Sequence, residues 1–257
     1  MLIAGIVPGL IIVLSYLVTI YIRVKLKPSL APSLPRVPWS GRIRSLRQTW
    51  GIGALAVFVI GGIYTGVFTP TEAGAVGATW ALFLTIIARK FTWPVLRDSI
   101  HETIRTTSMV FLIVIGAFIF GHFLSITRLP TTISTWITEL PVAPTVVIVG
   151  IVIFYLILGL FIDMVAAMFI TLPIILPAVI KLGYDPIWFG VLVVFLAEIA
   201  LATPPFGLGL FIINGVIDGS KLSEISIGVL PFILADFVIL AILIALPEVV
   251  MFLPNLM

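Results

Sequence analysis

Two short stretches interrupt otherwise apolar tracts and contain the residues best suited to binding an ion. They are residues 159–164 (Gly-Leu-Phe-Ile-Asp-Met) and residues 202–207 (Ala-Thr-Pro-Pro-Phe-Gly). Consecutive prolines remove two N–H donors and leave carbonyl oxygens unpaired. Such oxygens can bind a sodium ion, while the N-terminus of a helix that resumes after the break favours an anionic group. Two breaks that meet at the mid-depth of a membrane would form an ion and substrate site.

A functional and a structural role must be weighed for each residue in or near these stretches. An acid inside an apolar tract is a functional candidate, which applies to Asp163. For the double proline flanked by Thr203 and Gly207 we favour a functional role over a simple kink. Glu198 lies five residues before Thr203, so it could belong to the site or brace the broken helix.

Other polar residues and prolines of the apolar tracts are better explained by structure. We expect Asp236 to bond a neighbouring helix and Glu72 to cap a helix start. Prolines often only kink membrane helices, and this is our interpretation of four of them: Pro173, Pro177, Pro231 and Pro247.

The composition is that of an integral membrane protein. Of 257 residues, 61% are hydrophobic and 10% are charged, whereas a soluble domain has roughly 25% charged residues. One soluble core of this size could not bury so much apolar surface. The chain has no cysteine, which excludes disulfides, thiolate metal sites and cysteine catalysis.

The elements that must position these residues are apolar helices of membrane-spanning length, about 20 residues each. A basic stretch at 23–49, with seven Lys/Arg and no acid, is expected to be a solvated linker. An amphipathic helix at 93–105 is expected to lie on the bilayer surface. The expected apolar segments are 2–22, 51–67, 72–88, 107–124, a short segment at 130–140, 143–183 broken near 159–163, 187–217 broken at 203–207, and 225–253.

The distribution of basic residues predicts which segments face the cytoplasm. Twelve of the fourteen Lys/Arg lie in 23–49, 89–105 and 218–225, so these three segments are expected to be cytoplasmic. The tract 143–183 must then enter and leave on the opposite side. A re-entrant hairpin and two full spans both satisfy this condition.

Three motifs resemble signatures of one transporter family. They are residues 64–75 (Tyr-Thr-Gly-Val-Phe-Thr-Pro-Thr-Glu-Ala-Gly-Ala), residues 183–191 (Gly-Tyr-Asp-Pro-Ile-Trp-Phe-Gly-Val) and residues 203–207 followed by Leu210-Phe211. Their order and spacing resemble those of the large membrane subunit, the DctM-like component, of tripartite ATP-independent periplasmic (TRAP) transporters. The resemblance extends over nearly the whole chain.

The resemblance implies an all-α integral membrane protein of the elevator type, of which this chain is the second inverted repeat and the C-terminal half. Residues 1–22 would be the last helix of the first repeat, 23–49 a cytoplasmic basic linker, and 50–106 scaffold helices with a surface arm helix. Residues 107–257 would belong to the transport core, with a helix at 107–124, a re-entrant hairpin at 143–183, an unwound helix at 187–217 and a last helix at 225–253. The first hairpin has no counterpart here, so we expect a fragment, one half of a split gene or a degenerate copy.

The same resemblance implies a permease subunit in the bacterial inner membrane that couples sodium flow to the uptake of organic acids. Its partners would be a small DctQ-like membrane subunit, a periplasmic DctP-like solute-binding protein, the missing first-repeat half and the lipid bilayer, with no nucleic acid and no resident cofactor besides the transported sodium. Gly159, Asp163, Met164, Thr203 and Pro204 would bind sodium, and the substrate would lie near Pro205, Phe206 and Gly207.

An intramembrane enzyme is the alternative from another class. An aspartyl protease needs an aspartate within Gly-x-Gly-Asp, but Phe161-Ile162 precede Asp163 and Leu234-Ala235 precede Asp236. The two histidines do not form the His-Glu-x-x-His motif of a zinc protease. We therefore expect no enzyme. A carrier of the same superfamily that works without a binding protein, and a scaffold subunit without transport activity, stay open as alternatives.

Overall fold

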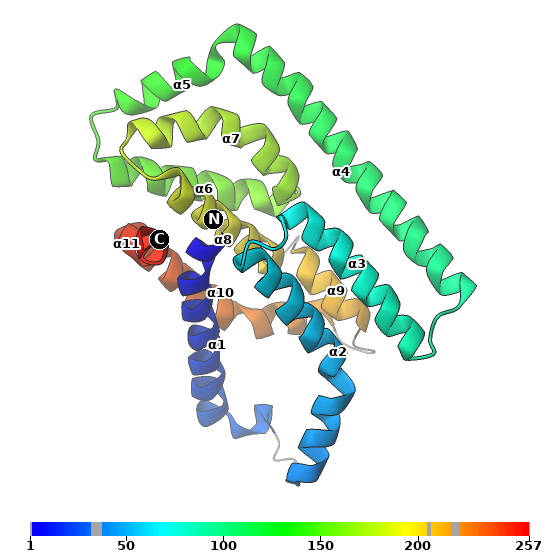
Figure 1. Cartoon of the computed structure of the whole chain (residues 1–257). Helices are drawn as coiled ribbons and strands as arrows, with labels where there is room; N and C mark the ends of the chain where they lie inside the picture. Colours follow the sequence, from blue (N-terminus) through cyan, green and yellow to red (C-terminus); the bar gives the residue numbers. More distant parts are fainter. Residues whose placement is uncertain (1, 32–37, 205–206, 217–220, 257) are drawn as a thin grey trace. The chain divides into compact units, whose positions relative to one another are not determined.

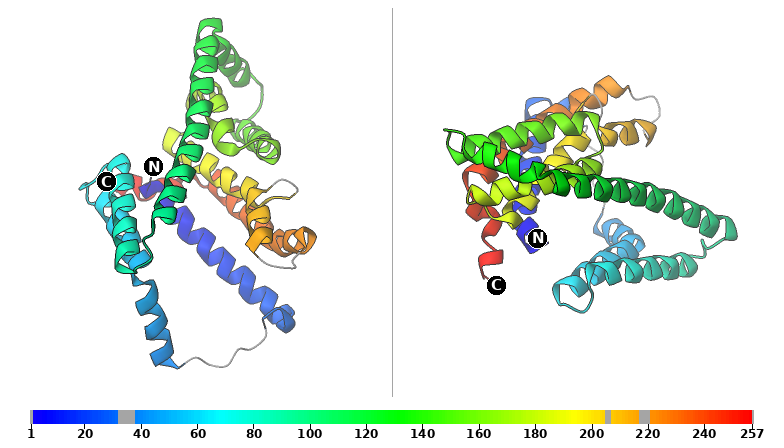
Figure 2. Two further views of the ribbon diagram at one scale, coloured as in Figure 1. Left: turned by 90° about the vertical axis from the view of Figure 1, so that its right-hand side faces the viewer. Right: turned by 90° about the horizontal axis from the view of Figure 1, so that it is seen from above.

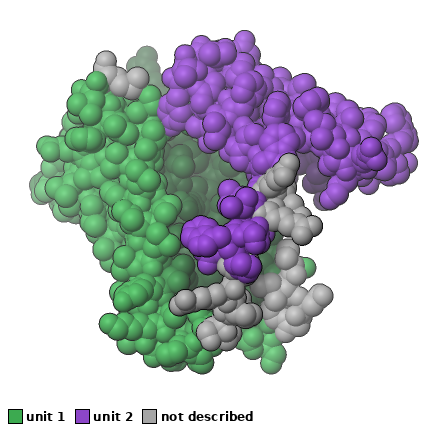
Figure 3. Space-filling view, turned by 60° about the horizontal axis from the view of Figure 1, so that its bottom comes forward, with its two compact units in different colours: residues 1–31, 111–257 green, residues 32–110 purple. Residues whose placement is uncertain are grey.

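The computed structural model describes the chain except residues 1, 32–37, 205–206, 217–220 and 257. The described residues form helices and connecting turns, without a β-strand. The chain divides into two compact units (Figure 3). Unit 1 comprises residues 1–31 and 111–257, and unit 2 comprises residues 32–110.

Unit 2 is built on two helices joined by a tight turn. They are α2 (Trp39–Tyr64) and α3 (Pro70–Ile87), followed by the first part of α4 (Trp93–Thr127). Thr69 caps α3 by accepting the N–H of Glu72, and the Glu72 carboxylate accepts the N–H of Thr69 in return. This reciprocal capping box confirms that Glu72 caps a helix start.

The described part of unit 1 contains the second part of α4 and eight further α-helices, seven of them downstream of α4. α6 and α7 form a hairpin, and α5 packs along α7 (Figures 1 and 2). The eight helices are α1 (Ile6–Leu26), α5 (Leu129–Thr138), α6 (Pro144–Phe161), α7 (Met164–Lys181), α8 (Pro186–Ala202), α9 (Leu208–Val216), α10 (Leu222–Ala245) and α11 (Pro247–Met251).

α8 is the centre of unit 1. It packs against α6, α7, α10 and α11, and most of its large side chains are buried, although Val194 and Leu201 are exposed by 55% and 46%. Trp188, Phe189, Leu192, Leu196 and Ile199 are each exposed by no more than 1%. The hairpin and α10 therefore pack against the same apolar helix.

A buried hydrogen bond ties α8 to the end of α10. The indole N–H of Trp188 donates to the carbonyl oxygen of Leu243 at 2.9 Å. In a continuous helix this oxygen would accept the N–H of residue 247, but Pro247 has none. Trp188 therefore supplies the donor that the proline removes.

Among the residues that the structure describes, six helical segments are long and apolar enough to cross a membrane: Ile3–Leu26, Pro70–Ile87, Trp93–Thr127, Pro144–Phe161, Met164–Lys181 and Leu222–Ala245. At most a third of the most apolar window of each is buried within the protein. Large apolar surfaces therefore face outward, as lipid requires. Together with the all-helical content, this agrees with the predicted integral membrane class.

Several expected boundaries differ from the structure. The surface helix 93–105 and the span 107–124 are one uninterrupted helix, α4, because Thr106 and Thr107 do not break the helical hydrogen bonding. The basic linker is also shorter than 23–49, since α1 continues to Leu26 and α2 begins at Trp39. The basic side chains of the expected linker thus lie largely on helix ends.

The last expected helix, 225–253, consists of two. Our interpretation of Pro247 as a kink is wrong, because α10 ends at Ala245 and α11 begins at Pro247. A proline disfavours helical geometry in the residue before it, and Leu246 has φ −128° and ψ 74°. Pro173, Pro177 and Pro231 lie inside helices, as predicted.

Candidate functional site

The hairpin tip is a two-residue break between α6 and α7. α6 ends at Phe161 because Ile162 is extended, with φ −128° and ψ 145°. Asp163 is the N-cap of α7, and its Oδ1 accepts the N–H groups of Val165 and Ala166 at 3.1 and 3.2 Å. The aspartate thus satisfies two of the free donors at the start of the helix, and the predicted break in 143–183 is confirmed.

Gly159 brings the hairpin tip into close contact with α8. A Cβ atom at this position would lie 2.5 Å from the Cβ of Ala200, which no normal packing allows. It would also lie 3.7 Å from the sulfur of Met164, a side chain exposed by only 5%. Glycine is therefore required here for the backbone of α6 to reach α8.

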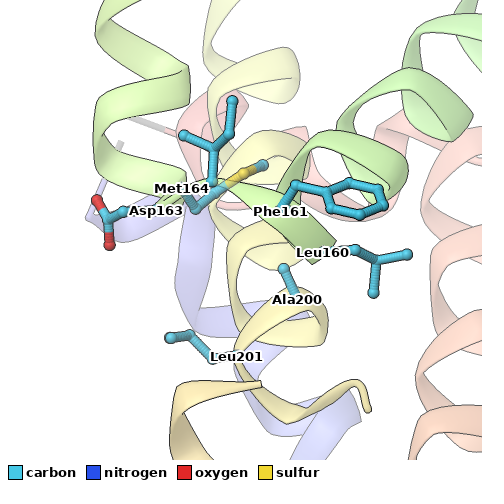
Figure 4. Close-up of a pocket in the computed structure, with 8 residues that line it drawn as sticks. Leu160, Phe161, Asp163, Met164, Ala200 and Leu201 are labelled. Carbon is cyan, nitrogen blue, oxygen red and sulfur yellow. The ribbon is translucent and has the colours of Figure 1, made fainter. Parts of the chain in front are cut away.

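A cavity of about 250 Å³ lies where the hairpin tip meets the end of α8 (Figure 4). In this view the Asp163 carboxylate points away from Ala200, consistent with its capping bonds to α7. Polar lining therefore comes mainly from backbone atoms and the aspartate at its edge. The lining residues are Gly159, Leu160, Phe161, Ile162, Asp163, Met164, Ala200 and Leu201.

The second predicted break follows this cavity directly. α8 ends at Ala202, and Thr203 is extended, with φ −87° and ψ 124°. The Thr203 hydroxyl donates to the carbonyl oxygen of Ile199 at 2.6 Å. α9 then begins at Leu208, so the interruption of 187–217 is confirmed.

Gly207 lies against the carbonyl oxygens of this break. Its N–H donates to the Thr203 oxygen at 3.0 Å. A Cβ atom at 207 would lie 2.7 Å from the oxygen of Leu201 and 2.8 Å from that of Thr203. Only glycine leaves room for two carbonyl oxygens on this side of the chain, and carbonyl oxygens are what a cation site at a helix break requires.

The predicted site residues are thus partly assembled within unit 1. Gly159, Asp163 and Met164 line one cavity, whereas Thr203 and Pro204 follow its last lining residue and are not among those that line it. Pro205 and Phe206, assigned to the substrate, lie outside the described residues. The sequence interpretation missed Ala200 and Leu201, which line the cavity through their contact with the distant hairpin tip.

The two arms of the hairpin are joined by a buried hydroxyl pair. The Tyr155 hydroxyl of α6 lies 2.7 Å from Oγ1 of Thr171 on α7. Thr171 itself donates to the carbonyl oxygen of Ala167 at 2.7 Å. Because the threonine hydroxyl has one proton, Tyr155 is the donor between the arms. This bond holds α6 and α7 together at a point between the hairpin tip and the outer ends of the two helices.

A second polar contact within unit 1 joins α1 to α10. The Tyr16 hydroxyl donates to Oδ2 of Asp236 at 3.0 Å, and the Tyr16 ring packs edge-on against Phe232. This confirms that Asp236 bonds a neighbouring helix. Asp236 is exposed by only 1%, and its Oδ1 has no partner among the described residues. Glu198 on α8 is not among the residues that line the cavity.

Comparison with known proteins identifies the family to which this arrangement belongs. The family profile of the DctM component of tripartite ATP-independent periplasmic transporters matches residues 1–249. The chain belongs to the DctM family. This confirms the resemblance of the three motifs, and a multi-pass protein of the bacterial inner membrane follows from family and helices together.

Several DctM relatives align with almost the entire chain. The chain is 37% identical to the C4-dicarboxylate TRAP transporter large permease protein DctM of Pseudomonas aeruginosa, over 98% of this chain and 59% of the relative. It is 32% identical to the sialic acid TRAP transporter large permease protein SiaM of Vibrio cholerae, again over 98% and 59%. A third relative is the 2,3-diketo-L-gulonate TRAP transporter large permease protein YiaN of Escherichia coli, with 34% identity over 80% of this chain and 50% of the relative. The chain therefore spans about three fifths of the first two.

Proposed function

We propose that this chain supplies the second-repeat half of the permease subunit of a sodium-coupled secondary transporter that imports organic acids. The observation that carries the proposal is the contact between the hairpin tip and the end of α8. There, two helix breaks lie next to one cavity, and Gly159 makes the approach possible. Broken helices at membrane depth are tolerated where they line a site.

Each part of the site has a role in the proposal. The hairpin tip (Gly159, Asp163, Met164) and the first residues of the α8 break (Thr203, Pro204) bind sodium through backbone carbonyls and the threonine hydroxyl. Asp163 orients the tip through its cap on α7 and adds negative charge at its edge. The N-terminus of α9, entered through Pro205, Phe206 and Gly207, faces the carboxylate of the substrate.

The substrate class is supported by the relatives, whose names include C4-dicarboxylate, sialic acid and 2,3-diketo-L-gulonate transporters. All three substrates are organic acids. Transport requires the first-repeat half, a DctQ-like membrane subunit and a DctP-like periplasmic binding protein. Residues 50–106 act as scaffold and arm, and the hairpin moves with α8 and α9 as an elevator-type core of inverted repeats.

The test uses the complete transporter, in which this chain works with its missing half, the small subunit and the binding protein. We expect Asp163→Ala and Thr203→Ala to abolish sodium-dependent uptake while the protein level in the membrane stays unchanged. The matched control is Asp185→Ala. Asp185 also caps a helix, accepting the N–H groups of Ile187 and Trp188 on α8, but it does not line the cavity.

Three results decide the outcome. Loss of uptake in both site variants, with uptake retained in Asp185→Ala, supports an ion site at the two breaks. Unchanged sodium dependence in both site variants removes the assignment. Equal losses in all three variants would mean that local helix structure has been disturbed, which also contradicts a specific ion site.

A further inference from the structure

The first three turns of α2 form an amphipathic segment, residues 39–50, which we call the α2 entry segment. Its four large apolar residues follow each other at spacings of four, three and four, which places them in one stripe along the helix. All four are exposed: Trp39 by 76%, Ile43 by 64%, Leu46 by 72% and Trp50 by 52%. The stripe thus has no cover within unit 2.

The charge of this segment has a single sign. Its ionisable residues are Arg42, Arg44 and Arg47, and no aspartate or glutamate precedes Glu72 in the chain. The Arg42 guanidinium lies 5.0 Å from the centre of the Trp39 ring, in a cation–π contact. Positive charge therefore lies directly beside the apolar stripe.

Neither water nor hydrocarbon suits this combination. An exposed stripe of two tryptophans, an isoleucine and a leucine is unfavourable at a helix end that is surrounded by water. A helix inside the hydrocarbon core would not contain three arginines within six residues. The boundary between headgroups and acyl chains accommodates both, and tryptophan and arginine are concentrated there.

We propose that the α2 entry segment binds anionic phospholipid at the membrane surface. The positive charge of the segment pairs with lipid phosphates, and the apolar stripe enters the outer acyl region. The occupant is inferred from charge complementarity, because a cytoplasmic leaflet is negatively charged and every ionisable residue of this segment is basic. Its attachment fixes the depth of α2, whose apolar part (Thr49–Tyr64) begins where the segment ends.

The absence of cysteine from the sequence allows a single spin label to report on this segment. The whole chain is reconstituted into phosphatidylcholine vesicles with and without phosphatidylglycerol, labelled at Ile43→Cys or at Ser45→Cys. Ile43 lies in the stripe, whereas Ser45 lies two residues on, outside it, with its hydroxyl bonded to the carbonyl of Gly41. We expect the label at 43 to become accessible to oxygen and protected from a water-soluble quencher only with phosphatidylglycerol, while the label at 45 stays in water.

Charge variants test the role of the arginines. We expect the triple variant Arg42→Gln/Arg44→Gln/Arg47→Gln to bind phosphatidylglycerol more weakly. The affinity of the segment for this lipid should fall by about fivefold for each arginine, or on the order of 100-fold together. The matched control, Lys90→Gln/Arg97→Gln/Arg105→Gln, removes the same charge elsewhere in unit 2 and should leave the label at 43 unaffected.

Three results would overturn the proposal. Equal water exposure of labels 43 and 45 with phosphatidylglycerol would show that the stripe does not enter lipid. Equal protection of label 43 in vesicles with and without phosphatidylglycerol would show that something other than anionic lipid, such as a second copy of the chain, covers it. An equal effect of both triple variants would show a response to net charge alone.

Discussion

The hydrogen bond from Trp188 to Leu243 permits a quantitative test of how unit 1 is held together. In Trp188→Phe the ring stacked on Tyr184 is kept, but the indole donor is lost, and the buried oxygen of Leu243 is left without a partner. An unsatisfied buried carbonyl costs about 1–3 kcal/mol. The smaller ring adds about 1 kcal/mol through imperfect packing. For a chain of this size the sum corresponds to a fall in Tm of about 4–16 °C.

Restoring the missing donor by another route separates the two contributions. Pro247→Ala supplies an N–H at the position from which a continuous helix bonds to Leu243. In the Trp188→Phe background it should therefore recover the hydrogen-bond part of the loss, whereas alone it should change stability little. The coupling between the two substitutions is expected to be about 1–2 kcal/mol.

The assay is the midpoint of thermal aggregation of the detergent-solubilised chain, followed by size-exclusion chromatography of the protein that stays in solution. Trp136→Phe is the control, because Trp136 lies on α5 and is 66% exposed, so the same chemical change should have little effect. The reasoning fails if Pro247→Ala lowers the midpoint equally in the parent chain and in the Trp188→Phe background. The bond from Trp188 to Leu243 would then not replace the donor that proline removes.

Further predictions concern the hairpin and the α2–α3 turn. Gly159→Ala should lower the aggregation midpoint and the uptake of the complete transporter, since overpacking costs about 1–3 kcal/mol, whereas Gly150→Ala on the same helix meets nothing within 4 Å and should be tolerated. Thr171→Val should destabilise the chain by about 1–3 kcal/mol because the buried Tyr155 hydroxyl loses its acceptor, and adding Tyr155→Phe should reverse much of the loss; no recovery would point to packing instead. Thr69→Ala should cost about 1 kcal/mol by removing the cap of α3, seen as faster amide hydrogen exchange in its first turn; unchanged exchange would contradict the cap.

Both helix breaks could be predicted from the sequence because their causes are local. The Thr-Pro-Pro-Phe-Gly run cannot continue a helix, whatever surrounds it. Asp163 was recognised as an acid in an apolar tract. Its bonds to the N–H groups of Val165 and Ala166 show that it caps α7 and so orients the hairpin tip.

The missed features depend on contacts between distant segments. Ala200 lines the cavity only because Gly159, some forty residues earlier, lies against it, and no local pattern encodes that pairing. The break at Pro247 was mistaken for a kink because the sequence does not show that Trp188 can take over the bond to Leu243. The division of α4 into a surface helix and a span failed for another reason: a change from polar to apolar composition does not interrupt helical hydrogen bonds.

The bond between Tyr16 and Asp236 restricts how this protein can be divided for experiments. A cut between α1 and α2 would leave the tyrosine on one piece and the aspartate on the other. The Asp236 carboxyl group, which is buried in the intact chain, would then face acyl chains. It would also lack the Tyr16 hydroxyl, its only hydroxyl donor among the described residues. Two-piece expression designs should therefore keep α1 and α10 on the same polypeptide, and truncation series that begin after Leu26 should be avoided.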